Sequence, residues 1–289
     1  MNSQRAYPKS FSFELFPPKT EAAELALKNT VEQLRQINPS YCSVTFGAGG
    51  STREKTFETV VNIQDDMGIA CAPHISCIAS THSHIREMLD AYKDRGIKRI
   101  VALRGDMPSG MLTTGELRYA NELVAFIRQE TGKYFHIEVA GYPEVHPQAA
   151  NAEKDLLNFK RKVEAGADSV VTQYFYNAES YFRFIDDCEK QGIDIPIVPG
   201  IMPITNYTQL ARFSELCGAD IPRWIRKRLE FFGDDRASIR AFGVDVVSTL
   251  CRRLLEQGAP GLHFYTLNQA EATLAIWKNI SEMENSPAC

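Results

Sequence analysis

Several features that mark other classes of protein are missing from this chain of 289 residues. None of its cysteines forms a C-x-x-C pair, so the sequence gives no support for a zinc ribbon or for thioredoxin-type chemistry. We expect these cysteines to be reduced, in a cytoplasmic setting, and most of them to serve as small buried hydrophobic residues. They are seven in number: Cys42, Cys71, Cys77, Cys188, Cys217, Cys251 and Cys289.

Long apolar runs are also missing. Residues 1–10 are polar and contain no apolar segment of the kind found in secretory signals, so we expect no such signal. No run reaches the length of a membrane span. The formal net charge of −4 gives no reason to expect nucleic acid or an anionic membrane as a partner. The short basic run at 223–228 is interleaved with apolar residues and is typical of a solvated helix face.

Neither of the common nucleotide-binding motifs is complete. No Walker A sequence is present, and the glycine-rich run GAGGST at 47–52 has Thr52 where a dinucleotide fingerprint has its third glycine. Without that glycine and a matching acidic residue, a Rossmann site is disfavoured. The glycines of this run indicate a tight loop or a close approach of the backbone to a ligand.

What the chain does have is a regular alternation of short β-branched or aromatic runs with longer amphipathic segments. Three of the amphipathic segments end in glycine, which favours the left-handed geometry that follows many helices. The predicted strands are 11–16, 41–46, 72–77, 99–104, 136–142, 169–175, 196–202 and 263–267. The predicted helices are 21–36, 53–66, 84–94, 117–130, 155–165 and 180–190, with extra helices near 222–232 and 237–256.

This alternation predicts an α/β protein made of parallel βαβ units. Most strands begin roughly 30 residues after the one before, which is the size of such a unit. An open, doubly wound sheet is the competing architecture, but eight strands of similar spacing favour a closed (β/α)8 TIM barrel. No linker or low-complexity tract divides the sequence, so we expect residues 1–289 to form a single domain.

A barrel places its chemistry where the strands end, and polar residues gather at those positions in this sequence. Glu14 is the most informative, because a carboxyl between Phe13 and Leu15 is expected to be desolvated. Desolvation raises the pKa of a carboxyl group, and a raised pKa suits a general acid near neutral pH. The alternative is a structural carboxylate paired with lysine or arginine. The other polar residues at strand ends are Thr45, His74, Arg104, Asp106, Tyr142, His146, Thr172, Gln173, Asn268 and Gln269.

Structural roles also remain open for several of these residues. Asp106 has the residue type that caps turns, His74 has the alternative of a hydrogen-bonded core histidine, and Gln173 that of satisfying buried backbone groups. Tyr142 and His146 are also consistent with a rigid loop flanked by proline. Taken together, the residues indicate a pocket and do not specify a reaction.

Six short motifs resemble those of the methylenetetrahydrofolate reductases and occur in the order found in that family. They are SFELFPPK at 12–19, ALRGD at 102–106, GYPEVHP at 141–147, TQYFY at 172–176, VPGIMP at 198–203 and HFYTLN at 263–268. The resemblance runs from about residue 11 to the last helix and is to the short bacterial-type members, which consist of the catalytic barrel alone. It implies a (β/α)8 barrel that carries FAD, a cofactor that spacing alone does not indicate.

The resemblance further implies that a reduced nicotinamide, NADH in preference to NADPH, supplies hydride through the flavin to 5,10-methylenetetrahydrofolate. The product would be 5-methyltetrahydrofolate, which feeds methionine synthesis. Glu14 matches the family's proton donor, and Asp106 matches a carboxylate beside the flavin and folate rings. A homo-oligomer is also implied, with no nucleic acid or membrane partner.

Two sets of binding residues follow from the same matching. The residues expected around FAD are Thr45, Phe46, Ala48, His74, Arg104, Gly105, Asp106, Tyr119, Ala120, Tyr142, His146, Asp155, Asn158, Arg161 and Lys162. The residues expected to contact the folate or nicotinamide substrate are Thr45, Asp106, Gln173, Gln209, Phe213 and Gln269. No metal site is expected.

One position departs from the family pattern. Gln269 stands where many members have an arginine that is associated with the glutamate tail of the folate, so that contact is in doubt. Two other functions are kept open: a barrel lyase or aldolase without flavin, and a flavin-binding or assembly protein without catalysis.

Overall fold

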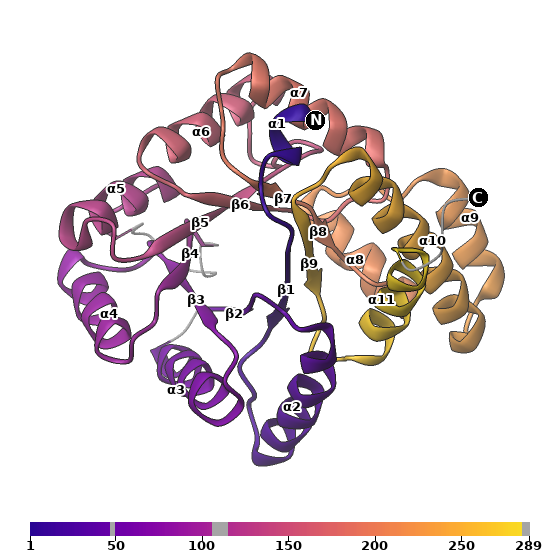
Figure 1. Cartoon of the computed structure of the whole chain (residues 1–289), viewed down its shortest axis with the longest axis horizontal. Helices are drawn as coiled ribbons and strands as arrows, with labels where there is room; N and C mark the ends of the chain where they lie inside the picture. The colour runs from indigo at the N-terminus through magenta and orange to yellow at the C-terminus, as the bar shows by residue number, and fades with distance from the viewer. Residues whose placement is uncertain (47–49, 106–114, 285–289) are drawn as a thin grey trace.

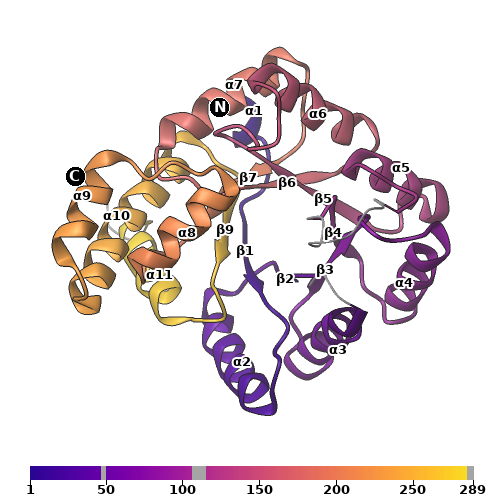
Figure 2. The same ribbon diagram turned by 180° about the vertical axis from the view of Figure 1, so that it is seen from behind.

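The computed structural model describes residues 1–46, 50–105 and 115–284. Parallel strands surround a central axis, and helices form a ring outside them (Figures 1 and 2). The strands are β1 (Ser10–Leu15), β2 (Tyr41–Val44), β3 (Cys71–Ser76), β4 (Arg99–Leu103), β5 (His136–Gly141), β6 (Ser169–Thr172), β7 (Ile197–Val198), β8 (Gly200–Ile201) and β9 (Gly261–Tyr265).

Most of the helices connect one strand to the next. They are α1 (Asn2–Arg5), α2 (Glu21–Leu34), α3 (Gly50–Met67), α4 (His82–Asp94), α5 (Ala120–Thr131), α6 (Ala152–Glu164), α7 (Ala178–Lys190), α8 (Tyr207–Cys217), α9 (Arg223–Phe232), α10 (Arg236–Gln257) and α11 (Glu271–Glu284), with a 3-10 turn, η1 (Arg35–Ile37), after α2. Side-chain caps define several starts: the Thr20 and Thr81 hydroxyls and the Asn151 carbonyl accept hydrogen bonds from backbone N–H groups of the first turn.

The barrel closes through an interrupted strand. The sheet order is β7-β6-β5-β4-β3-β2-β1-β9-β8, and every described pair is parallel. Only Pro199 separates β7, which pairs with β6, from β8, which pairs with β9. Proline has no N–H to donate, but its carbonyl accepts a hydrogen bond of 3.0 Å from the His263 backbone N–H. Segment 197–201 therefore acts as one strand, and the predicted (β/α)8 barrel is confirmed.

The predicted helices differ from the observed ones mainly at their ends. Gly96, Gly166 and Gly192 do follow α4, α6 and α7 with positive φ, as the glycine pattern predicts. However, α5 begins at Ala120 and not at residue 117. Helices α1 and α8 were not predicted, and the last helix, α11, was expected without bounds. Helix α8 matters for the site because it carries Phe213, and its ends are set by Asn206, which caps the N-terminus, and by Gly218 in the left-handed region.

The inside and the outside of the barrel have different chemistry. Phe13 and Leu15 point outward from β1 into the main core, which fills the space between the strands and the helices. Alternation then turns Ser12 and Glu14 inward. A TIM barrel interior is usually filled by branched apolar side chains. Here the apolar cluster inside is small, and many of the other inward side chains are polar.

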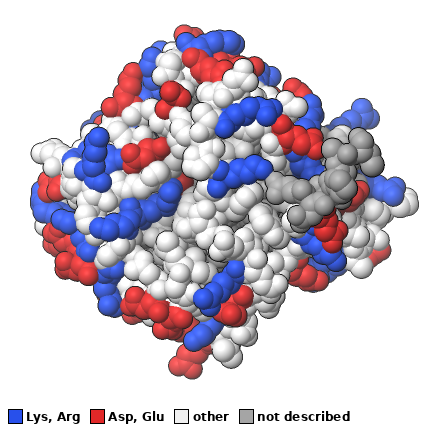
Figure 3. Space-filling model, in the orientation of Figure 1, with Lys and Arg blue, Asp and Glu red and all other residues white. Residues whose placement is uncertain are grey.

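The outer surface carries charges of both signs. On the face in Figure 3, basic and acidic side chains are interspersed around a mostly uncharged centre. Among the helices that the structure describes, none is both long and apolar enough to cross a membrane.

Candidate active site

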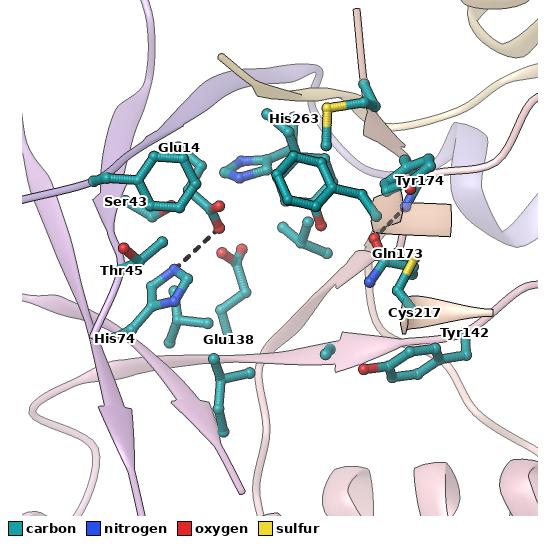
Figure 4. Close-up of a pocket in the computed structure, with 18 of the residues that line it drawn as sticks. Glu14, Ser43, Thr45, His74, Glu138, Tyr142, Gln173, Tyr174, Cys217 and His263 are labelled. Atoms are coloured by element: carbon teal, nitrogen blue, oxygen red, sulfur yellow. Dashed lines mark hydrogen bonds and ion pairs between the residues drawn. The ribbon is translucent and has the colours of Figure 1, made fainter. Parts of the chain in front are cut away.

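A cavity of about 470 Å³ opens inside the barrel at the carboxyl ends of its strands. Its walls come from strands on all sides of the barrel and from α8, so it occupies the position at which barrel enzymes bind their substrates. Figure 4 shows its polar residues, with Glu14 and His74 on one side and Gln173 and Tyr142 on another. It is lined by Glu14, Phe16, Ser43, Thr45, His74, Val101, Leu103, Glu138, Val139, Ala140, Tyr142, Val171, Gln173, Tyr174, Met202, Phe213, Leu216, Cys217, His263, Tyr265 and Leu267.

Glu14 lies near the end of β1, where the parallel pairing places it beside Ser43 of β2 and Tyr265 of β9. Its side chain is 14% exposed. Burial raises the pKa of this carboxyl from 4.5 to about 8, because the charged form would be poorly solvated. At neutral pH Glu14 is therefore mainly a carboxylic acid, which has a proton to donate.

The partner of Glu14 is a histidine. Nε2 of His74, on β3, lies 3.5 Å from Oε2 of Glu14, as the dashed line in Figure 4 marks. Burial lowers the pKa of His74 to about 4, so its imidazole is neutral at pH 7. Such a neutral partner leaves the proton on Glu14. The alternative of a pairing with lysine or arginine thus differs from the contact that is observed.

Other predicted residues form the rim of the same cavity. Thr45 and Gln173 follow β2 and β6, and the Gln173 side-chain oxygen accepts a hydrogen bond of 3.0 Å from the Tyr174 backbone N–H. Phe213 reaches the cavity from α8. The geometry thus brings Glu14, His74, Thr45, Gln173 and Phe213 together around one space, and aromatic and amide groups of this kind suit a flat heteroaromatic ligand.

Predicted residues in the loop after β5 and on α6 are connected, and Tyr142 among them lines the cavity. The Tyr142 and His146 rings pack edge to face, with centroids 4.5 Å apart. Asp155, in the first turn of α6, accepts a hydrogen bond of 2.8 Å from the His146 backbone N–H. On the same helix, Arg161 donates to Asn158. Lys162 donates to the Ala140 carbonyl, and burial lowers its pKa to about 8.

Among the predicted residues after β4, Gly105 has a backbone conformation that requires glycine. Gly105 has a φ of +83°, and a Cβ at this position would lie 2.0 Å from Oγ of Ser76. The Arg104 side chain extends to Gln148. Tyr119 is the N-terminal cap residue of α5 and is exposed, and Ala120 is the first residue of that helix. Phe46, after β2, lies under the Arg53 guanidinium at 5.5 Å.

Four predicted residues stand apart from this arrangement. Ala48 and Asp106 lie outside the described residues. Gln209, in the first turn of α8, and Gln269, after β9, are exposed, and neither is among the described residues that line the cavity.

The structure also places residues in the cavity that sequence reasoning missed. Ser43, Glu138, His263 and Tyr265 all line it. Glu138 had a detectable signal, since it is a charge within the strand 136–142 between Ile137 and Val139. The same test of a carboxyl in an apolar strand singled out Glu14. His263 and Tyr265 lie in the family motif at 263–268, but nothing in the sequence separates an inward side chain from a core residue there.

Metal chemistry has no support in the described parts of the chain. No group of three or more His, Cys, Asp or Glu side chains is placed there to hold a metal ion.

Comparisons with known proteins agree with this description. A solved structure of an uncharacterized protein from Clostridium thermocellum, which binds two copies of 5-methyl-5,6,7,8-tetrahydrofolic acid, matches 98% of this chain and 97% of its own with a TM-score of 0.67. Its sequence identity is 16%, so the match shows a shared fold. The 5,10-methylenetetrahydrofolate reductase of Escherichia coli is 41% identical over 266 residues, which are 92% of this chain and 88% of that protein.

A longer plant relative matches as well. Methylenetetrahydrofolate reductase (NADH) 1 of Zea mays is 38% identical over 96% of this chain, which spans about half of that protein's length. The family model of methylenetetrahydrofolate reductase matches residues 2–281. The chain therefore belongs to the methylenetetrahydrofolate reductase family.

Proposed function

We propose that this protein reduces 5,10-methylenetetrahydrofolate to 5-methyltetrahydrofolate, with FAD as its cofactor and a reduced nicotinamide as the source of hydride. The observation that carries the proposal is the neutral carboxylic acid of Glu14 at the base of the cavity. Reduction of the one-carbon bridge needs an acid, because the bridge must open to an iminium ion before it can accept hydride.

Glu14 supplies that acid in the proposal. Its carboxyl proton goes to the folate nitrogen that leaves as the bridge opens, and Glu14 becomes a carboxylate. A positioned general acid contributes about 10²- to 10⁴-fold to a rate. The neutral imidazole of His74, 3.5 Å away, orients the carboxyl without removing its proton at neutral pH.

The residues beside the cavity fit FAD. A dinucleotide cofactor needs cations for its diphosphate and a close backbone approach for its rings. Arg104 and Lys162 provide cations on the β4 and β5 side of the barrel mouth, and Arg161 extends the set along α6. The glycine conformation at Gly105 provides the close backbone approach. The same proposal includes the other residues expected around FAD, which are Thr45, Phe46, Ala48, His74, Asp106, Tyr119, Ala120, Tyr142, His146, Asp155 and Asn158.

When bound, FAD would supply the transfer of hydride from the nicotinamide to the folate. The protein's own contribution is to hold the nicotinamide ring and the folate ring, one after the other, in the same place. In our proposal Phe213 packs against the substrate rings and Gln173 hydrogen-bonds to them, because both line the cavity that contains Glu14. The carboxylate of Asp106 stabilises the positive charge of the iminium ion electrostatically.

NADH is the proposed reductant, which agrees with the name of the Zea mays relative. The proposal further places the product in methionine synthesis, the protein in the cytoplasm, and the subunit in a homo-oligomer. The proposal treats residues 1–289 as a single catalytic domain.

The visible spectrum of the purified protein tests the proposal. Flavin absorbance should be present, should bleach anaerobically with NADH, and should return on addition of 5,10-methylenetetrahydrofolate. A colourless protein would favour a lyase or aldolase. A yellow protein that NADH does not bleach, or that folate does not recolour, would favour a passive flavin-binding protein.

A further inference from the structure

A second buried carboxyl, Glu138, lies in the same cavity as Glu14. It projects inward from β5 and is 1% exposed. The Tyr41 hydroxyl donates to its two oxygens at 2.7 and 2.8 Å, and the Ser169 hydroxyl donates to Oε2 at 3.0 Å. Arg99 completes the cluster with Nη1 at 3.3 Å from Oε2. These contacts cross the barrel, because β2 and β5 are separated by two strands in the sheet.

The cluster extends to the N-terminal end of the barrel, which lies opposite the cavity mouth. Arg99, His136 and Ser169 are the first residues of β4, β5 and β6. Nε2 of His136 and Oγ of Ser169 are 2.7 Å apart. The Arg99 side chain is 27% exposed, and His136 is also partly exposed. Hydrogen bonds therefore run without a break from partly exposed His136, through Ser169, to buried Glu138.

On its inner side, Glu138 faces the cavity beneath Glu14. Figure 4 shows the carboxyl groups of Glu14 and Glu138 projecting into the same space, with His74, Ser43 and His263 around them. Ser43 is fully buried, and among the described residues its hydroxyl has no hydrogen-bond partner. Buried hydroxyls normally have one, so this hydroxyl, which the strand register places beside Glu14, points to a small polar occupant such as water.

A purely structural role explains this cluster poorly. Burying a carboxylate and a guanidinium costs desolvation energy that their attraction often fails to recover, and branched apolar side chains fill the floor of most barrels at no such cost. The charged groups instead connect the cavity, which Glu138 lines, to the N-terminal end of the barrel, where Arg99 and His136 are partly exposed. We therefore assign the cluster a role in the proton chemistry of Glu14, which lines the same cavity.

We propose that Glu138 is the innermost protein residue of a proton path that begins at the N-terminal end of the barrel. This path returns a proton to Glu14 from the side of the cavity opposite its mouth. The proposal rests on the proposed function, in which Glu14 loses its proton to the folate. At that moment the folate fills the mouth of the cavity, so the floor is the route that remains open to solvent.

Each proton movement along the path is balanced. His136 takes a proton from solvent at Nδ1 and passes the proton on Nε2 to Ser169, whose own hydroxyl proton goes to the Glu138 carboxylate. The Glu138 carboxyl formed in this way gives its proton to water beside Ser43, and that water gives one to the Glu14 carboxylate. His136 ends as a neutral imidazole, and Glu138 ends as the carboxylate that Arg99 and Tyr41 contact. The groups that face Glu138 are Tyr41, Arg99 and Ser169 at the hydrogen bonds and His74, His263, Tyr265 and Glu14 around the cavity.

The state of Glu14 during a single turnover tests this path. Anaerobically reduced enzyme is mixed with 5,10-methylenetetrahydrofolate while flavin absorbance and the infrared band of the Glu14 carboxylic acid are recorded. The band is identified by its absence from Glu14→Gln. In the wild type, the band should recover as fast as the flavin is oxidised, before product leaves.

Two variants interrupt the path while keeping the shape of the floor. In Glu138→Gln and Ser169→Ala, flavin oxidation in the first turnover should stay within about twofold of wild type, because Glu14 starts protonated. Recovery of the band should slow by about a hundredfold, the lower end of what positioned proton transfer contributes, and should follow product release. Ser248→Ala is the matched control. It removes an equally buried hydroxyl, which accepts a hydrogen bond from Asn279 between α10 and α11, and it should behave as wild type.

The outcomes separate the two proposals. Recovery at the wild-type rate in both path variants would overturn the path while leaving Glu14 as the acid. First-turnover flavin oxidation that slows as much as band recovery would show that the cluster is structural, which also overturns the path. Folate reduction at the wild-type rate in Glu14→Gln would instead overturn the role of Glu14. If Glu138→Gln fails to fold, Ser169→Ala decides the question alone.

Discussion

Nε2 of His74 lies 3.5 Å from Oε2 of Glu14, and burial drives both groups toward their neutral forms. The pKa of Glu14 rises to about 8, and that of His74 falls to about 4. An ordinary ion pair would shift both in the opposite directions. Between these two values the pair is a carboxylic acid beside a neutral imidazole. A proton is therefore available to the substrate without a permanent charge in the cavity.

The first prediction concerns the pH dependence of the folate half-reaction. Because Glu14 must be protonated to open the folate bridge, the rate should be constant at neutral pH and fall about tenfold per pH unit above pH 8. Reduction of the flavin by the nicotinamide needs no such acid and should lack this decline. Stopped-flow measurements of each half-reaction between pH 6 and 10 check it. A rate that already falls about tenfold per pH unit between pH 6 and 8 would show that Glu14 has an ordinary pKa.

The second prediction is that Glu14→Gln lowers the rate of folate reduction and raises the free energy of unfolding at neutral pH. Folate reduction should fall by about 10² or more while flavin reduction persists. The raised pKa of Glu14 means that its stabilising effect is fully present below pH 4.5, the unfolded value, and is lost as the pH rises toward 8. At pH 7 the loss is on the order of 3 kcal/mol, which the neutral glutamine avoids.

Urea denaturation at pH 5 and pH 8 measures this stability. The variant should exceed wild type clearly at pH 8 and only slightly at pH 5. The lowered pKa of His74 acts in the opposite window, because its contribution is present above pH 6.5 and is lost as the pH falls toward 4. That loss occurs in both proteins and cancels in the comparison. Equal gains at the two pH values would point to packing in place of ionisation.

Local patterns in the sequence were sufficient to predict the strands of the barrel. They did not lead to helix α8 or to the break in the strand at Pro199. The alternating hydrophobic runs and the terminal glycines are properties of neighbouring residues. Helix α8 was missed although its signals are local: Asn206 and Gly218 mark its ends, and apolar residues recur at 207, 210, 211 and 217 with helical spacing. The break at Pro199 depends on which strand each half can pair with, which no local pattern contains.

The same distinction holds for the site. Glu14 was found because a charged residue within an otherwise apolar strand stands out in the sequence, although Phe13 and Leu15 point away from it into the outer core. Its contact with His74, however, joins β1 to β3, and the bond from Tyr41 to Glu138 joins residues 97 positions apart. Sequence reasoning therefore indicated which carboxyl is desolvated, but the partners that set its chemistry required the closed barrel.

The third prediction concerns Asp106, whose role comes from the family resemblance. Asp106→Asn removes a negative charge while keeping the size of the side chain. If that charge lies beside the flavin, the reduction potential should rise and folate reduction should slow, because the iminium ion loses an electrostatic partner. Potentiometric titration of both proteins measures the first effect. An unchanged or lower potential in the variant would place Asp106 away from the flavin and favour a turn-capping role.

The fourth prediction concerns Gln269, which is exposed directly after β9. An arginine can hold a carboxylate through two charge-assisted hydrogen bonds, whereas a neutral amide forms weaker ones. Hydrogen bonds to charged groups are worth about 1.5–3 kcal/mol, so one such bond corresponds to about tenfold or more in affinity. Gln269→Arg should therefore tighten folate binding by about tenfold, provided that the glutamate tail passes this position.

The measurement is the folate Kd of both proteins at low and moderate salt, with the nicotinamide half-reaction as an internal check that should not change. Gln257→Arg is a matched control, because Gln257 is also exposed but ends α10 before β9 begins, at the opposite end of the barrel. It adds the same charge far from the cavity mouth. Tightening in Gln269→Arg alone, weakened by salt, would show that the wild-type protein holds the tail loosely. Equal tightening in both variants would indicate a general attraction of the anionic folate. No tightening in either would mean that the tail does not pass this position, or that another cation, such as exposed Lys19 after β1, already binds it.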